Sequence, residues 1–99
     1  MIRGTTPKLE FALPFEIDSL DEAYITLSQK NVPLVEKSLE NCECAGKTLS
    51  VRLAQEDTLK LDCDYHTEIQ VRAKLISGEV IASNIFTCST GRILKDGVI

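Results

Sequence analysis

The stretch that decides the fold runs from Thr67 to Leu75 and reads TEIQVRAKL. Apolar and polar residues alternate along it, so every second side chain lies on the same side of an extended chain. The apolar side carries Ile69, Val71, Ala73 and Leu75. A period of two over this length is typical of a β-strand that packs one face on a core and turns the other to water.

Similar segments along the chain predict further strands, which are separated by turn residues. The predicted ranges are Lys8–Leu13, Ala23–Gln29, Pro33–Leu39, Asn41–Cys44, Thr48–Leu53 and Val80–Ser89. Turns are expected at Lys30-Asn31, at Ala45-Gly46-Lys47 and at Ser77-Gly78-Glu79, because asparagine and glycine tolerate a left-handed backbone. The charged segment Gln55–Thr58 is expected to form one helical turn at a corner, after which Leu59 and Leu61 return to the core.

The second of these strands has a helical alternative. Ser19 and Glu22 have the spacing of a helix capping box, and Ile17, Leu20, Tyr24 and Leu27 lie at helical intervals. The run Tyr24-Ile25-Thr26 favours a strand, because β-branched side chains lose rotamer freedom in a helix.

The chain has 99 residues, of which 43% are hydrophobic and 26% charged, as expected for one folded domain. We predict an all-β fold, an immunoglobulin-like Greek-key β-sandwich of about seven short antiparallel strands. A small barrel is the alternative. The sandwich is expected to span residues 1–91, with residues 92–99 as a C-terminal tail.

Charge and composition argue against several classes of partner. The net charge is −4, and the lysines and arginines are scattered, whereas a nucleic-acid-binding protein needs clustered cations. The chain has no tryptophan and few aromatic residues, which disfavours a base-stacking or sugar-stacking surface. No apolar run is long enough to span a bilayer, and no secretion signal is visible. We therefore expect a cytoplasmic protein without nucleic-acid or membrane partners.

Two groups of residues have the chemistry of metal ligands. Cys42, Cys44, Cys63 and His66 offer the ligand types of a zinc site, but Cys-x-Cys is a poor zinc knuckle. Four reduced cysteines, Cys88 being the fourth, are better explained as small buried thiols in a reducing compartment. Glu56, Asp57, Asp62 and Asp64 offer oxygen ligands for calcium, but the glycine and regular spacing of a dedicated loop are absent. We expect no metal and no cofactor.

No catalytic arrangement is visible. His66 is the only histidine, and nothing in the sequence pairs it with a nucleophile. We therefore expect a protein that is not an enzyme.

The C-terminal tail is the best candidate for an interface. Its aliphatic residues lie beyond the last predicted strand, where they either fold back onto the domain or remain available to a partner. These residues are Ile93, Leu94, Val98 and Ile99.

The order of strands and several short motifs resemble a group of small phage and prophage β-proteins, among them the immunoglobulin-like N-terminal domain of the phage baseplate upper protein. The motifs are Ile2–Thr6, Leu53–Leu59, Glu68–Arg72 with the Gly78 hairpin, Ala82–Ile85 and Ile93–Gly97. The last two resemble uncharacterised proteins from prophages of gut Firmicutes.

The resemblance implies a virion component of the tail or baseplate that acts through protein–protein contacts, with itself or with other virion proteins, and it supplies no catalytic residue. This chain differs by ending after one domain. The alternative function is a ligand- or carbohydrate-binding module, for which a polar pocket near Asp62–His66 is expected.

Overall fold

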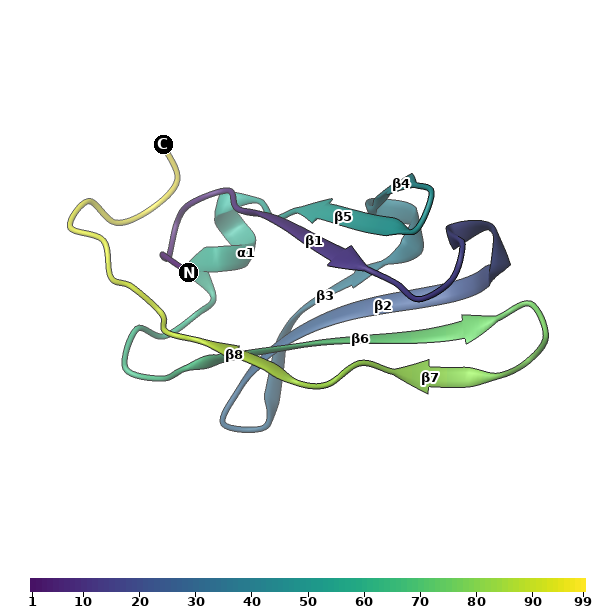
Figure 1. Ribbon diagram of the computed structural model, residues 1–99. Helices are drawn as coiled ribbons and strands as arrows, with labels where there is room; N and C mark the ends of the chain where they lie inside the picture. The colour runs from purple at the N-terminus through teal and green to yellow at the C-terminus, as the bar shows by residue number, and fades with distance from the viewer.

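The computed structural model describes residues 1–99 and consists mainly of two antiparallel β-sheets (Figure 1). The smaller sheet has the strand order β1-β5-β4, formed by Lys8–Ala12, Thr48–Arg52 and Glu43–Ala45. The larger sheet has the order β3-β2-β6-β7, formed by Val32–Ser38, Leu20–Gln29, Thr67–Leu75 and Val80–Ala82. A short strand β8, Phe86–Cys88, also pairs with β6. The predicted all-β class is confirmed.

Local sequence accounts for the hairpins and the corner. Strand β2 is extended as expected, and only a single 3₁₀ turn, η1 (Ile17–Ser19), precedes it. Lys30 and Asn31 join β2 to β3 with φ of 52° and 63°. The Gln55–Leu59 segment forms the short helix α1, and a second 3₁₀ turn, η2, covers Leu39–Asn41.

No helix in the chain is long and apolar enough to cross a membrane.

The core lies between the two sheets and draws on both. Leu49, Val51 and Leu53 point from the β5 region toward the buried faces of β2 and β6. The apolar face predicted for Thr67–Leu75 is confirmed, because Ile69, Val71 and Ala73 of β6 are buried in the same cluster. The other members of this cluster are Ile17, Leu20, Ala23, Ile25, Leu27, Val35 and Leu61.

The predicted long strand over Val80–Ser89 is wrong. The structure has two short strands there, β7 and β8, with a break at Ser83-Asn84-Ile85. At the break, the Ser83 hydroxyl accepts a hydrogen bond from the Val71 N–H at 3.0 Å and donates one to the Asn84 carbonyl at 2.8 Å. Because a side chain takes the place of a backbone partner, the ladder along β6 is interrupted and the chain bends.

The expectation of buried thiols is also wrong. All four cysteines are free; Cys44 and Cys63 are exposed, and Cys42 and Cys88 are half-buried. Cys44 lies on the short edge strand β4 and Cys63 lies in the loop before β6, so neither reaches the core. Partial burial raises the pKa of the Cys42 thiol, and the neighbouring Cys44 adds to the effect, which makes Cys42 a weaker nucleophile.

A buried polar cluster joins the end of β2 to the loop before β6 and to the segment after β8. The Gln29 side-chain amide donates to the Asp62 carbonyl at 2.8 Å and accepts from the Asp62 N–H at 2.8 Å. The same amide lies 3.3 Å from the hydroxyls of Thr67 and Thr90, which are 2.7 Å apart. Because these groups satisfy one another, the cluster can stay buried and fixes the loop that leads into β6.

Candidate interaction surface

Strand β1 is an edge strand whose outer side has no partner. It pairs only with β5, and the Leu53 N–H bonds to the Pro7 carbonyl while the Leu13 N–H bonds to the Lys47 carbonyl. In an antiparallel pair, alternate residues bond to the partner strand, so the odd-numbered residues of β1 face β5. The backbone N–H and C=O groups of Lys8, Glu10 and Ala12 therefore point away from the sheet, as a ready template for another strand.

An apolar cleft opens beside this edge, between the two layers. It has a volume of about 270 Å³ and is lined by Lys8, Leu9, Glu10, Phe11, Ile69 and Phe86. The rings of Phe11 and Phe86, one from each sheet, have centroids 6.4 Å apart at a tilt of 44°. Phe86 nevertheless remains 51% exposed. The two sheets thus part along this side and leave aromatic surface in contact with water.

A second apolar cleft continues along the same side of the molecule. Its volume is about 220 Å³, and its residues come from the end of β1 with the following loop, from β6, and from β7 with the residue that follows it. They are Ala12, Leu13, Pro14, Phe15, Val71, Ala73, Ile81, Ala82 and Ser83. We call the outer side of β1 together with these two clefts the open flank. Contiguous apolar surface of this kind is typical of a protein-binding site.

The C-terminal tail is held to the domain mainly by polar contacts, and most of its aliphatic side chains face water. The backbone N–H and C=O of Ile99 bond to the Gln55 side-chain amide, each at 2.9 Å. Leu94 is 92% exposed and Ile99 is 88% exposed, and Val98 is exposed as well. Ile93 is half-buried and lies against Gly4. The predicted interface residues are thus accessible, apart from part of Ile93, and their role stays a prediction.

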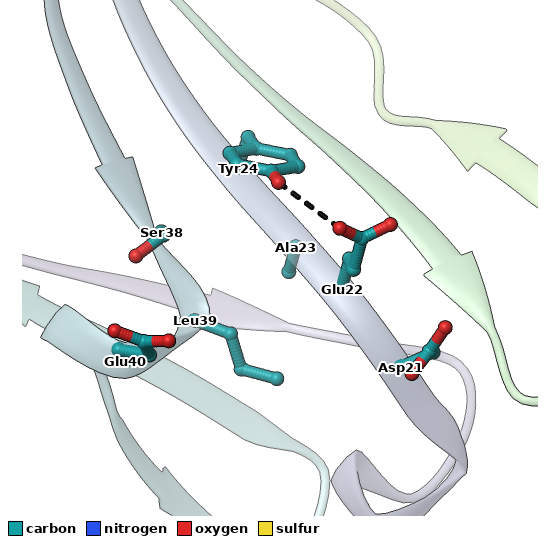
Figure 2. Close-up of a pocket in the computed structure, with 7 residues that line it drawn as sticks. All are labelled: Asp21, Glu22, Ala23, Tyr24, Ser38, Leu39 and Glu40. Atoms are coloured by element: carbon teal, nitrogen blue, oxygen red, sulfur yellow. Dashed lines mark hydrogen bonds between the residues drawn. The ribbon is translucent and has the colours of Figure 1, made fainter.

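An acidic hollow lies beside the first half of β2, next to η2 (Figure 2). It has a volume of about 220 Å³ and carries the carboxylates of Asp21, Glu22 and Glu40. The Tyr24 hydroxyl donates a hydrogen bond to Glu22 at 3.2 Å; this bond, followed by the negative charges nearby, raises the pKa of Tyr24 above its ordinary 10.0. The carboxylates are exposed and have no buried polar group aimed between them, as is usual on a solvated surface.

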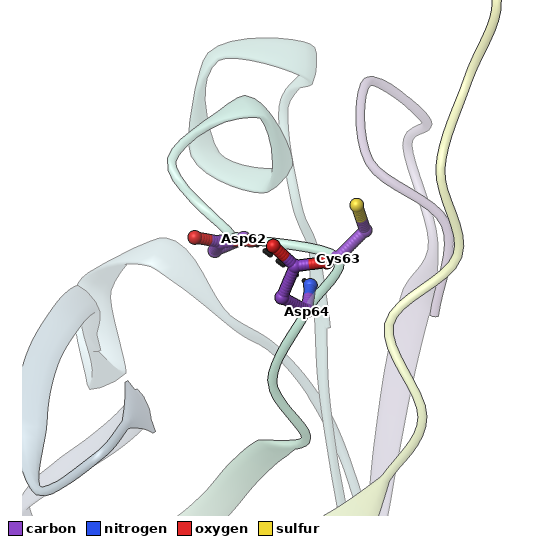
Figure 3. A group of neighbouring side chains, drawn as sticks. All are labelled: Asp62, Cys63 and Asp64. Carbon is purple, nitrogen blue, oxygen red and sulfur yellow. Dashed lines mark hydrogen bonds between the residues drawn. The ribbon is translucent and has the colours of Figure 1, made fainter.

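The predicted metal ligands are only partly brought together. Asp62, Cys63 and Asp64 have ligand atoms within 4.8 Å of one another, all exposed, and Figure 3 shows the three side chains on one short loop. The Asp64 N–H bonds to the Asp62 carboxylate at 2.9 Å, which is an ordinary turn contact. The cysteines of the β4 region and His66 are not part of this group.

Asp57, the other acidic residue considered for calcium, has a different role. Its carboxylate is mostly buried, accepts the Ala54 N–H at 2.8 Å and lies 2.9 Å from the Lys37 ammonium. These contacts hold the start of α1 and link it to β3. The carboxylate is therefore committed to the fold and is not free to bind an ion.

The polar pocket expected near Asp62–His66 is a shallow hollow. Its volume is about 260 Å³, and its lining consists of Arg3, Leu61, Asp62 and Cys63. The Arg3 guanidinium is occupied there by the Leu61 and Leu59 carbonyls, at 2.7 and 3.1 Å. The exposed His66 does not line it.

In comparisons with protein families, with curated proteins and with solved structures, none matches this chain. The sequence predicts β1, as Lys8–Leu13, but not the open flank. The alternation of Lys8 and Glu10 with Leu9 and Phe11 was the available signal, because charged residues on the outer side are common on edge strands.

Proposed function

We propose that this chain is a non-enzymatic assembly module that binds protein through the open flank. The observation that carries the proposal is the coincidence of an unpaired strand edge with two apolar clefts on one side of the molecule. An unpaired edge supplies backbone hydrogen bonds to a partner strand, and the clefts accept its alternate side chains. A partner that covered Phe86 and the β1 edge would bury apolar surface and satisfy free backbone groups together.

The strand order supports the immunoglobulin-like version of the fold. In such domains the sheets have the orders B-E-D and C′-C-F-G, and the chain crosses between them from B to C, from C′ to D and from E to F. Here β1-β5-β4 and β3-β2-β6-β7 follow the same orders, with α1 at the last of these crossings. A strand A would cover the outer side of β1, but Ile2 instead forms a parallel bridge with Gly91. The open flank is the position such a strand would fill.

The motifs that resemble phage baseplate proteins extend the proposal to a location. We propose that the chain is part of a prophage-encoded tail or baseplate. The test is to induce phage particles in the source organism, purify them on a density gradient, and probe the fractions with an antibody against the chain. Co-migration with intact particles is expected, and a chain confined to the top of the gradient contradicts this location.

The binding role itself has a separate test. A chain carrying Phe86→Asp should no longer be incorporated into particles. It should keep its β-sheet circular dichroism, because Phe86 is half exposed and lies outside the buried core. Tyr24→Asp is the matched control, because Tyr24 is an exposed aromatic residue that lines the acidic hollow and not the open flank. Equal incorporation of both variants would overturn the assignment of the open flank.

A further inference from the structure

The open flank has a self-complementary pattern of charge. The outward side chains of β1 are Lys8, Glu10 and Ala12, and the ammonium of Lys8 lies 3.8 Å from the Glu10 carboxylate within the same strand. A strand that presents a cation and an anion on adjacent outward positions can pair antiparallel with a copy of itself, so that each charge faces its opposite. This inference rests on the proposed protein-binding role and names its partner.

We infer that the flank binds a second copy of this chain, edge to edge, with β1 of each copy antiparallel to β1 of the other. The free backbone groups belong to even-numbered residues, so only certain registers bring them together. In one register Lys8 lies opposite Glu10 of the second copy, twice over, and Leu9 lies opposite Leu9. Two ion pairs then flank the twofold axis.

The neighbouring registers are worse for stated reasons. A shift that places Glu10 opposite Glu10 sets like charges across the interface. It also places each Lys8 opposite Ala12 of the other copy, where the lysine has no anion to face. A shift in the other sense places Lys8 opposite Lys8, which again sets like charges across the interface and leaves both Glu10 carboxylates without a cation opposite them. The charge pattern therefore selects one register, and closure about a twofold axis prevents growth into a fibre.

The clefts support the same arrangement. Leu9 and Phe11 lie on the inner face of β1 and line the cleft with Phe86 and Ile69. When two β1 strands meet at Leu9, the two copies of this cleft face each other across the axis. The exposed Phe86 rings would then be covered, and the two small sheets would join into one continuous sheet, which removes the free edge.

The test compares charge variants of the purified full chain by sedimentation velocity, from about 1 μM to about 1 mM, since association depends on concentration. The wild type is expected to show a monomer–dimer equilibrium. Lys8→Glu alone and Glu10→Lys alone should each weaken the dimer by about tenfold or more, because both create like-charged pairs. The double variant with Lys8→Glu and Glu10→Lys should restore the wild-type constant, because every pair is again of opposite sign.

Two further variants separate pairing from other contacts. Glu10→Pro removes one outward N–H without touching the bonds to β5, and it should abolish the dimer. Leu94→Asp changes the exposed tail and should leave the dimer intact. Circular dichroism confirms that each variant keeps its fold. A chain that is monomeric at all concentrations, a double variant that fails to restore the dimer, or a dimer lost only with Leu94→Asp overturns the inference.

The outcomes are distinguishable from those of the particle experiment. A monomeric chain that still enters particles through Phe86 overturns self-pairing but leaves the assembly role standing. A dimer that never enters particles contradicts the virion location and leaves the self-pairing standing.

Discussion

The carboxylate of Asp57 lies 2.9 Å from the ammonium of Lys37 and accepts the Ala54 N–H at 2.8 Å, so one side chain joins the corner helix to the edge of the larger sheet. Burial by itself would raise the pKa of Asp57, but the hydrogen bond from Ala54 and the charge of Lys37 outweigh it, and the pKa lies below its ordinary 3.8. A depressed pKa means that the ionised form is stabilised by folding.

Asp57→Asn should therefore destabilise the protein in a pH-dependent way. The stabilisation from Asp57 is complete above the pKa of the unfolded chain, which is the ordinary 3.8, and is lost as the pH falls through the lower folded value. We expect a loss of about 1–2 kcal/mol in the free energy of unfolding at pH 7, which shrinks toward zero once the pH has fallen below the folded pKa of Asp57. Urea unfolding at several pH values measures it. Glu56→Gln, on the exposed neighbour, should change little, and an equal effect of both would contradict the assignment.

Gln29→Leu should be among the most costly single changes. The leucine fits the buried position but leaves the Asp62 N–H and C=O without their partner, so we expect a loss of about 2–4 kcal/mol. Thermal unfolding followed by circular dichroism provides the measurement. Gln70→Leu is the matched control, because Gln70 makes a single bond to the Ser83 carbonyl and is only half-buried. The reverse ranking of the two variants would count against a structural role for the buried cluster.

Gly4→Ala should loosen the C-terminal tail. Gly4 has φ of +71°, and a Cβ there would lie 2.9 Å from Cδ1 of Ile93. The backbone alone costs about 1–2 kcal/mol for an L-residue, and the contact also pushes Ile93 away. Gly46→Ala, with φ of +60° and open space around it, pays only the backbone cost. Hydrogen exchange should therefore be faster in the first variant only at the amide of Gly91, whose N–H bonds to the Met1 carbonyl at 2.7 Å near the start of the tail. Equal rates in both variants would refute the contact.

Ser83→Ala should weaken the junction between β7 and β8. The Val71 N–H loses the hydroxyl at 3.0 Å, and alanine offers nothing in its place, which predicts a loss of about 1–2 kcal/mol. Ser77→Ala, in the exposed hairpin turn, is the control. Amide exchange at Val71 should accelerate in the Ser83 variant alone. Unchanged exchange there would show that the hydroxyl does not hold the strand.

Much of the fold could be predicted because its signals are local. The bounds of β6, the left-handed turn at Lys30-Asn31 and the helical turn at Gln55 each follow from neighbouring residues. The break at Ser83 could not be predicted, because the contact that decides it is with Val71 on another strand. Backbone partners in a sheet come from other strands, and the alternation of apolar and polar residues along one strand does not predict which residues they are.

The candidate surface was harder to predict for the same reason. The tail residues were identified because they follow the last strand, whereas the open flank depends on which strand lies at the edge of each sheet. The burial of Gln29 likewise depends on partners 33 and 61 residues away. The prediction for the cysteines followed the usual burial of this residue type. It was wrong because Cys44 lies on an edge strand and Cys63 lies in a loop, where both are exposed.

The parallel bridge between Ile2 and Gly91 brings both chain ends to the pole of the molecule that carries α1 (Figure 1). The amino terminus itself donates to the Ser89 carbonyl at 2.7 Å. A fluorescent reporter or affinity tag attached beyond Ile99 would emerge at that pole rather than across the outer side of β1. Labelled copies can therefore be mixed for energy-transfer measurements without blocking the open flank.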